Sequence, residues 1–208
     1  MSITELFIAF VLGIAFAAPP GIVTVESIRR GVVGGFWSAL AVGAGSLIGD
    51  AVYATLALSG LAALVQHPRA QWTIGAVGGV VLCVLARSAL RAELPTSPAT
   101  VSANERRNAF LAGAALSLTN PWAIAFWLGF GGVLLSAGIS EPERDIVRFL
   151  FAFLAGAALW GVVLSGLIAW GRRYVGARLF RYVSLCSAMI FLGTAFYTWW
   201  MIIRRMVL

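Results

Sequence analysis

Charged residues and reactive side chains are scarce in this sequence. Only 11% of its 208 residues are charged, against roughly 25% in a soluble domain, lysine is absent, and there is one histidine. Cys83 and Cys186 stand alone in apolar stretches without a partner at metal or redox spacing, so we expect small buried side chains and no metal site. No phosphate-binding loop of the nucleotide-hydrolysing type occurs, which disfavours ATP-driven chemistry. These absences argue against an enzyme and against a bound cofactor.

Apolar residues, by contrast, make up 61% of the chain and form long uncharged stretches. A helix of about 20 apolar residues crosses a bilayer, and this length predicts an all-α polytopic membrane protein with six transmembrane helices. The expected spans are 6–25, 34–62, 71–92, 108–136, 148–170 and 181–203. The polar stretch after the third span is too short to fold by itself. We therefore expect one integral membrane domain, divided into residues 1–92, a connector 93–107, and residues 108–208.

Two of these spans contain residues that interrupt a helix. Pro19-Pro20-Gly21 lies toward the end of the first span, and Asn120-Pro121 lies inside the fourth. Proline removes a helix donor and clashes with the preceding turn, and hydrocarbon offers the freed carbonyl groups no partner. Such breaks persist where protein buries them or where they line a cavity. A pair of them in corresponding halves of one chain is typical of the binding site of a secondary transporter.

The two halves of the chain resemble each other weakly around these breaks. Aligning Pro20 with Pro121 sets residues 12–20 against residues 113–121, and few of the aligned residues are identical. Each half holds three predicted spans, and an odd number makes the second half enter the membrane in the opposite sense. The sequence therefore predicts two inverted three-helix repeats whose breaks lie near each other at mid-depth.

Asp50 is an ionisable residue near the middle of the second predicted span. Helical spacing places Ser46, Asp50, Tyr53 and Ala57 on one stripe of polar and small residues. An ionised carboxylate in a bilayer costs several kcal/mol unless it is hydrated, paired or protonated, so we expect the stripe to face the protein interior. Asp50 then serves transport or, alternatively, forms a buried hydrogen bond between helices.

Three further polar residues have both a structural and a functional interpretation. Glu26 stands four residues before Arg30, the favourable order for a helical ion pair. Alternatively, Glu26 contributes to a cytoplasmic entrance for a cationic or zwitterionic solute. Thr119 and Asn120 suit a substrate's amino or carboxylate group, and they are equally suited to capping a bent helix. The sequence does not decide between these alternatives.

Small residues at four-residue spacing occur in three of the spans. The pairs are Gly45 and Gly49, Gly75 and Gly79, and Ala157 and Gly161. Such pairs let helix backbones approach closely. We expect ordinary close packing of helices from them, which is compatible with transport.

All fifteen basic residues are arginines, and their distribution bears on orientation. Ten lie in the connectors after the first, third and fifth spans: Arg29, Arg30, Arg87, Arg91, Arg106, Arg107, Arg172, Arg173, Arg178 and Arg181. By the positive-inside rule these connectors are cytoplasmic, which places both termini outside. The formal charge of +7 therefore indicates topology. Nucleic-acid binding would need the arginines on one folded face together with stacking aromatic residues.

Short motifs follow one another in a specific order along both halves. They are Ala18-Pro19-Pro20-Gly21, the turn Arg29-Arg30-Gly31, Gly43-x-Gly45-x-x-x-Gly49-Asp50-x-x-Tyr53-Ala54, Leu58-Ser59-Gly60-Leu61, Thr119-Asn120-Pro121-x-Ala123 and Leu192-Gly193. This set, which covers essentially the whole chain, resembles the LysE/RhtB superfamily of bacterial amino-acid exporters. The family typically has Pro-Gly-Pro at the first break, whereas this chain has Pro20-Gly21-Ile22. The chain therefore departs from the family at a position that shapes the break.

The resemblance implies a secondary transporter of the bacterial inner membrane that works by alternating access. It would export an amino acid, a basic one included, or a related small metabolite, driven by a proton gradient or the membrane potential. The residues that we expect to bind the substrate are Pro20, Gly21, Asp50, Tyr53, Asn120 and Pro121. Asp50 and Glu26 are the expected coupling residues. The lipid bilayer is the other expected partner, and the sequence leaves open whether the protein forms a homodimer.

Two other functions stay open at this point. A metal-ion or other inorganic-ion exporter would need several carboxylates, histidines or thiols that converge in the membrane, and the sequence offers one clear carboxylate there. A non-transporting membrane scaffold or electron carrier would leave the paired breaks without a role.

Overall fold

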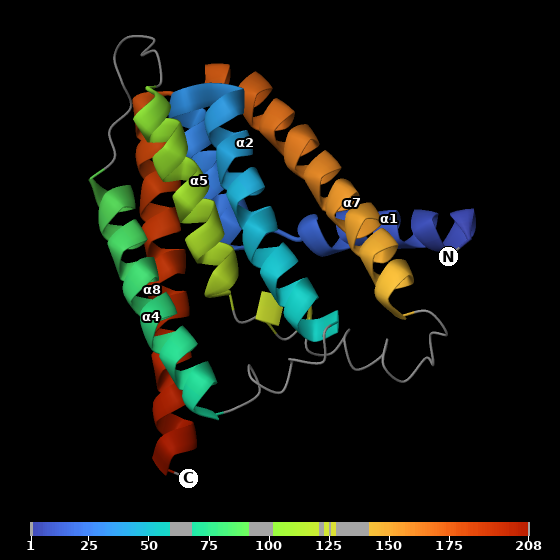
Figure 1. Ribbon diagram of the computed structural model, residues 1–208. Coiled ribbons are helices and arrows are strands. Elements are labelled where there is room, and N and C mark those ends of the chain that lie inside the picture. Colours follow the sequence, from blue (N-terminus) through green and yellow to red (C-terminus); the bar gives the residue numbers. More distant parts are fainter. Residues whose placement is uncertain are drawn as a thin grey trace.

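The regular structure of the described residues is entirely helical. The computed structural model describes residues 2–58, 68–91, 102–120, 123, 124, 126, 127 and 142–207. Its elements are α1 (Ile3–Ala17), α2 (Ile22–Leu58), α4 (Pro68–Leu90), α5 (Ala103–Leu118), α7 (Pro142–Gly171), the 3-10 helix η1 (Arg172–Tyr174) and α8 (Ala177–Val207) (Figure 1). The predicted all-α class is therefore confirmed for the described part of the chain.

Three helical segments are long and apolar enough to cross a membrane. They are Ile22–Leu56, Val147–Tyr174 and Ala177–Arg204, and two shorter apolar helices cover Ile3–Ala17 and Ala76–Leu90. Large apolar side chains such as Phe151, Trp170 and Phe196 are more than half exposed, as a lipid-facing surface requires. Cys186, which we expected to be buried, is also exposed on α8. These features are those of a multi-pass membrane protein.

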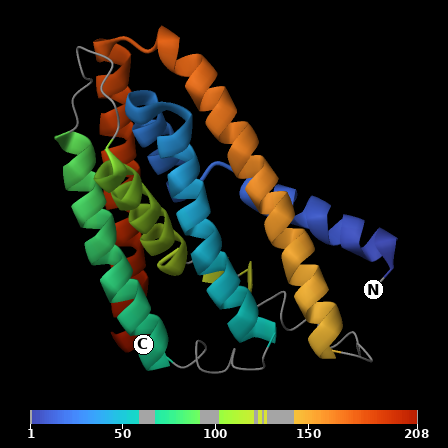
Figure 2. The same ribbon diagram turned by 45° about the horizontal axis from the view of Figure 1, so that its top comes forward.

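Helix α2 folds back on itself at Gly35. The backbone of Gly35 has φ 71° and ψ −159°, a conformation essentially restricted to glycine. We call residues 22–34 the first arm and residues 36–58 the second arm; the two lie side by side and run in opposite directions (Figures 1 and 2). The Arg172 guanidinium packs against Gly35, within 2.6 Å of where a side chain would begin.

The position of this turn corrects two predictions. The first span was expected to end near residue 25, and Arg29-Arg30-Gly31 was expected to form the turn, yet residues 22–34 are helical throughout. The arginines do not end the helix because Glu26, one turn earlier, pairs with both of them along the helix. The chain reverses at the first residue that takes up a positive φ.

Both predicted breaks are present. Helix α1 ends at Ala17 and α2 begins at Ile22, since Pro19 and Pro20 remove two consecutive donors. Helix α5 ends at Leu118, and Thr119 leaves the helical conformation with φ −109° and ψ 4°. A helical bond from the Ile124 amide to the Asn120 carbonyl, 3.1 Å long, follows this second break. Pro121 lies outside the described residues.

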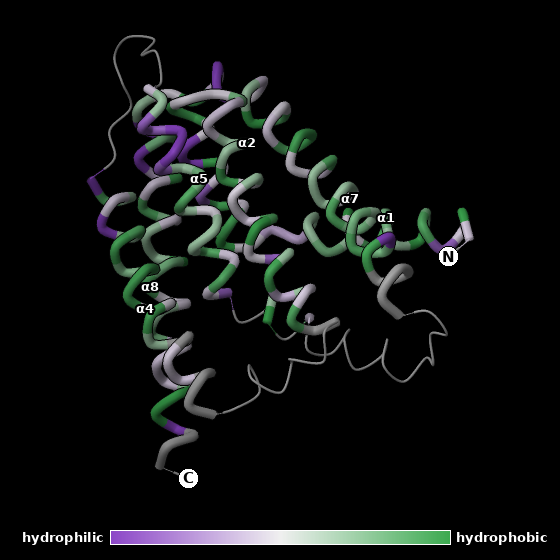
Figure 3. The backbone as a smooth tube through the Cα atoms, in the orientation of Figure 1, coloured by the Kyte–Doolittle hydropathy of each residue, from purple (hydrophilic) through white to green (hydrophobic). Residues whose placement is uncertain are grey.

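The helices form a bundle in which α1 runs crosswise (Figures 1 and 2). One apolar cluster joins the first arm of α2 to α4, α5 and α8 through Ile22, Leu85, Leu116 and Phe191. A second cluster joins α1, the second arm and α7 to the chain beyond the second break, and includes Ala9, Tyr53, Trp127 and Phe153. Figure 3 shows apolar residues along the helices and polar residues gathered near the end where α2 turns. The end of α5 lies between the two clusters.

Four glycines let two pairs of helices touch through their backbones. A side chain at Gly13 or Gly156 would overlap the backbone of the other helix in the pair α1 and α7, at the carbonyl groups of Phe153 and Phe10. In the pair α2 and α5, a side chain at Gly45 or Gly113 would overlap the carbonyl groups of Phe110 and Val42 in the same way. The close packing expected at Gly45 is confirmed, whereas Gly161 has no neighbour within 4 Å of a side chain's first atom.

We predict opposite effects of alanine at two helical glycines. Gly45→Ala should lower stability by about 1–3 kcal/mol because the methyl group meets the Phe110 carbonyl. Gly193→Ala, at a glycine on α8 with open space beside it, should raise stability by about 1 kcal/mol through helix propensity. Thermal unfolding of the purified variants in detergent checks both signs. Stabilisation by both substitutions would contradict the close approach of α2 and α5.

Candidate functional site

Asp50 lies on the second arm of α2 and reaches the last turn of α5. It is only 7% exposed, and its Oδ1 accepts a 3.0 Å hydrogen bond from Ser117 Oγ. Ser117 is itself buried and stands three residues before Asn120 of the second break. The acid of one half of the chain is therefore tied to the break of the other half.

Tyr53, one turn after Asp50, makes a second contact with the same turn of α5. Its hydroxyl group donates a hydrogen bond to the carbonyl oxygen of Leu118, the last residue of α5. That carbonyl is one of the four that a helix leaves without an intrahelical partner. Tyr53 is buried as Asp50 is, which confirms that the predicted stripe faces the interior at both positions.

Two glycines let the neighbouring helices close around the second break. A side chain at Gly49 would come within 2.5 Å of Ser117 Oγ, and one at Gly78 of α4 would come within 2.7 Å of Thr119 Cβ. Any larger residue at these positions would push α2 or α4 away. The hydrogen bond between Asp50 and Ser117 thus depends on the absence of a side chain at Gly49.

Thr119 and Asn120 shape the break itself. Thr119 Oγ1 donates to the Ala115 carbonyl at 2.7 Å, and the Asn120 amide donates to the Ser117 carbonyl at 3.1 Å. The Asn120 carbonyl then accepts from the Ile124 amide. Of the two interpretations of Thr119, the structure shows the local capping one.

The first break presents backbone donors. Pro20 and Gly21 are exposed, and the first helical bond of α2 runs from the Val25 amide to the Gly21 carbonyl at 3.0 Å. The amides of residues 22–24 therefore have no partner within the helix, and the start of α2 carries a partial positive charge. Such a helix start suits a carboxylate.

The structure brings the two breaks into one region. Ile22, the first residue after one break, packs in the same cluster as Leu116 of α5. Phe16, just before the first break, packs in a tilted arrangement against Phe126, which follows the second break, with ring centroids 4.4 Å apart. The partly positive start of α2 and the partly negative end of α5, with Asp50 beside it, therefore lie in the same part of the bundle.

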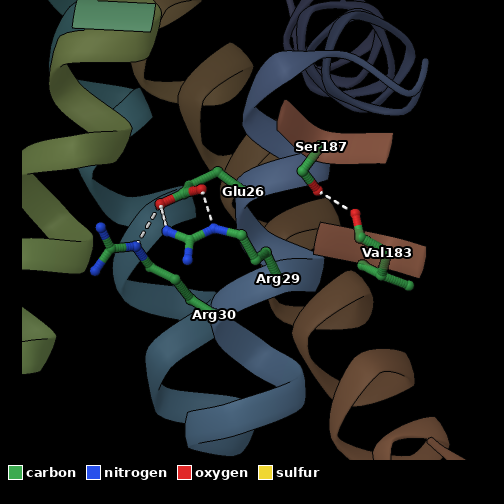
Figure 4. A network of polar contacts seen from close by, with 5 residues as sticks. All are labelled: Glu26, Arg29, Arg30, Val183 and Ser187. Carbon is green, nitrogen blue, oxygen red and sulfur yellow. Dashed lines mark hydrogen bonds and ion pairs between the residues drawn. The ribbon is translucent and has the colours of Figure 1, made fainter. Parts of the chain in front are cut away.

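Glu26 forms a separate cluster on the first arm of α2 (Figure 4). Its carboxylate is completely buried and accepts from Arg29 Nε at 2.9 Å and Arg29 Nη2 at 2.7 Å. Arg30 Nε donates to the same carboxylate, so the predicted pair of Glu26 and Arg30 is confirmed. Arg29 is a partner that the sequence reasoning missed, although its three-residue spacing is a favourable one.

Sequence reasoning also missed the residues that hold Asp50 and Tyr53 in place. Ser117, Gly49 and Gly78 all contact the second break or its last helical turn. Ser117 carried one usable signal, since it is a polar residue one turn before a proline break in an apolar span. Gly49 was predicted to pack closely as one of the pair Gly45 and Gly49, but not to adjoin the second break, and Gly78 carried no signal.

Comparison with known proteins gives a consistent result. The family model of the LysE type translocator matches residues 14–200. The chain is 38% identical over 167 residues to "Chemotactic transduction protein ChpE" of Pseudomonas aeruginosa, which covers 79% of this chain and 82% of the relative. It is 24% identical over 197 residues to "Putative amino acid efflux protein YcgF" of Bacillus subtilis, which covers 93% of this chain and 94% of the relative.

No solved structure matches the chain. The family match nevertheless spans both breaks, the Asp50 contact and the Glu26 cluster. The chain therefore belongs to the LysE type translocator family, whose members are transporters and not enzymes.

Proposed function

We propose that the protein exports an amino acid from the cytoplasm by proton-coupled alternating access. The observation that carries this proposal is the hydrogen bond from Ser117 to Asp50, which places a buried acid at the second helix break. Helix breaks inside a membrane expose backbone groups that bind substrates and ions. An acid at such a break supplies the exchangeable negative charge that a cationic group or a proton needs.

The charges around the breaks favour a zwitterion. Asp50 and the end of α5 attract an ammonium group, whereas the free amides at the start of α2 attract a carboxylate. An α-amino acid carries both groups on one carbon atom. Pro20, Gly21, Tyr53, Asn120 and Pro121 complete the proposed site by shaping the two breaks and closing the second one.

The glycine contacts support two repeats of three helices each. Gly13 contacts Phe153, and Gly113 contacts Val42. The two glycines are 100 residues apart, and their two partners are 111 residues apart, with each partner in the other half of the chain. The contacts of Gly45 with Phe110 and of Gly156 with Phe10 follow the same two offsets. A twofold axis between the halves exchanges contacts in this way, and three spans in each half would make the repeats inverted. The offset of 100 residues pairs Pro20 with Asn120, whereas the sequence alignment paired Pro20 with Pro121.

We assign the coupling of export to Asp50. Of the described carboxylates, only Asp50 and Glu26 are buried, and Glu26 is engaged with two guanidinium groups. Among the described residues, Asp50 has only a hydroxyl partner, so its charge is the one that a proton or a substrate ammonium can neutralise. For a basic amino acid, carrying its additional positive charge out against an inside-negative potential costs about 2.3 kcal/mol per 100 mV, which an entering proton offsets. A coupling role of Glu26 stays a prediction.

The distribution of the arginines supports the proposed orientation of the protein in the membrane. The end of the bundle where α2 turns also holds the end of α4, the start of α5, the end of α7 and the start of α8 (Figures 1 and 2). The ten arginines predicted to be cytoplasmic belong to these segments. By the positive-inside rule we place this end in the cytoplasm.

Two alternatives predict different measurements. A metal-ion exporter needs converging ligands, and within the described ranges no three histidine, cysteine, aspartate or glutamate residues come together. A sensory role is suggested by the name of the Pseudomonas aeruginosa relative. A sensor binds its amino acid without moving it across the vesicle membrane, so a flux assay separates a sensor from an amino-acid exporter.

We predict that Asp50→Asn abolishes efflux driven by a pH gradient because asparagine cannot carry the proton. The measurement is efflux of a panel of labelled amino acids from proteoliposomes. Glu105→Gln is the matched control, since it removes the same charge from an exposed acid that caps α5. It should leave efflux unchanged. Normal pH-driven efflux by a correctly inserted Asp50→Asn protein would refute the assignment of Asp50.

We also predict that Ser117→Ala lowers the efflux rate about tenfold. A hydrogen bond to a charged group contributes roughly 1.5–3 kcal/mol, and its loss leaves Asp50 without its hydroxyl partner. Ser165→Ala is the control, because Ser165 is equally buried but donates to Gly161 of its own helix. Equal rates for both variants would show that Ser117 has no part in the site.

A further inference from the structure

The Glu26 cluster carries charges that do not cancel. One carboxylate faces two guanidinium groups, which leaves a net charge of +1. Glu26 is fully buried and the Arg29 side chain is 8% exposed, whereas the Arg30 side chain is 20% exposed. A buried charge without a counterion is unfavourable. The cluster therefore favours the arrival of one further anion, and Arg30 is the member that such an anion can reach.

Among the described residues, the neighbouring segments supply no second carboxylate to the cluster. Arg172 of η1 packs at Gly35, and Arg181 of α8 donates to the Leu90 carbonyl at 2.9 Å. Both groups are cationic, and they deepen the positive potential at this end of the bundle. The nearest described acid on α5, Glu105, is engaged at the start of its own helix.

Helix α8 places hydroxyl groups at the level of the cluster. Ile22 of α2 packs in one apolar cluster with Ala188 and Phe191 of α8, and the first arm and α8 run in opposite directions (Figure 1). The turn of α2 that contains Glu26 therefore lies beside the turn of α8 that contains Ser184 and Ser187. Figure 4 shows Ser187 on the opposite side of Glu26 from the terminal nitrogens of Arg30, with its hydroxyl donating to the Val183 carbonyl at 2.7 Å.

Several hydrogen-bond donors of this region are unused. Arg30 contacts Glu26 through Nε alone, which leaves its two terminal nitrogens without a partner among the described residues. A guanidinium group has five N–H donors that match a carboxylate in pairs. Ser184 Oγ is completely buried and has no hydrogen-bond partner in the described part of the chain. Unused donors beside an excess positive charge are what a bound anion would complete.

We propose that Arg30, beside Arg29, forms a second binding subsite, which takes the carboxylate of the solute before it reaches the helix breaks. The identity of that solute rests on the proposed export of an amino acid. Glu26 holds the two arginines in place when the subsite is empty, and a second carboxylate brings the cluster to neutrality. Glu26 lies five residues after Gly21, about 8 Å along the helix, so a carboxylate can pass from this subsite to the amides at the start of α2.

Binding of acetate, compared with acetamide, tests this subsite without relying on transport. The full-length protein is placed in phosphatidylcholine nanodiscs, and its thermal unfolding midpoint is measured at constant ionic strength. Acetate should raise the midpoint and acetamide should not, because only acetate carries the charge. In Glu26→Gln the half-saturating acetate concentration should fall about tenfold, since a competing carboxylate is removed.

Two arginine variants separate a subsite from general charge attraction. Arg30→Gln should abolish the acetate effect, whereas Arg106→Gln, which removes an exposed arginine at the same end of the bundle, should retain it. Equal losses in both variants, or equal effects of acetate and acetamide, would overturn the proposal. If Glu26→Gln does not fold, the comparison of the two arginine variants decides by itself.

A lipid phosphate is the competing occupant of the cluster. Replacing phosphatidylcholine by phosphatidylglycerol should preserve the acetate effect, and loss of the effect would show that a lipid headgroup fills the subsite instead. If the protein binds acetate in the expected pattern but moves no amino acid, the subsite is supported and the proposed function is rejected. Amino-acid efflux without selective acetate binding would reject the subsite alone.

Discussion

The end of α5 is held by side chains from another helix. A helix leaves its last four carbonyl groups without intrahelical partners, and the interior of a bilayer offers no water to replace them. Tyr53 donates to one of these carbonyls, Ser117 of the same turn donates to Asp50, and Gly49 permits the close approach. The second arm of α2 thus closes the break and carries the acid. In the proposed mechanism, a substrate group that replaces one of these contacts also loosens the arm from α5.

The two buried acids, Glu26 and Asp50, have different kinds of partner. Glu26 faces two guanidinium groups on its own helix, so its charge is fixed by residues that move with it. Asp50 faces a hydroxyl group on a different helix, so its contact can change when the halves move. In the proposed mechanism, the fixed cluster contributes to the positive charge of the cytoplasmic end, and the exchangeable acid responds to the proton and the substrate.

The sequence predicted features that depend on local chemistry. Pro19, Pro20 and Asn120-Pro121 end helices within one turn, so the breaks could be located without a structure. The contact between Asp50 and Ser117 joins residues 67 positions apart, and no local pattern specifies it. The turn at Gly35 was misplaced because Arg29 and Arg30 were taken to mark a helix end. Their pairing with Glu26 lets the helix continue to a glycine that can adopt a positive φ.

In the proposed mechanism, one acid at the breaks exchanges a proton for one amino acid. The most direct test is the reversal of flux in proteoliposomes, using the labelled amino acid that the protein moves and imposing the pH gradient and the voltage separately. With a zwitterionic substrate and one proton, the substrate gradient at which flux reverses should shift about tenfold per pH unit, and about tenfold per 60 mV. A reversal point that does not respond to the pH gradient would contradict the account.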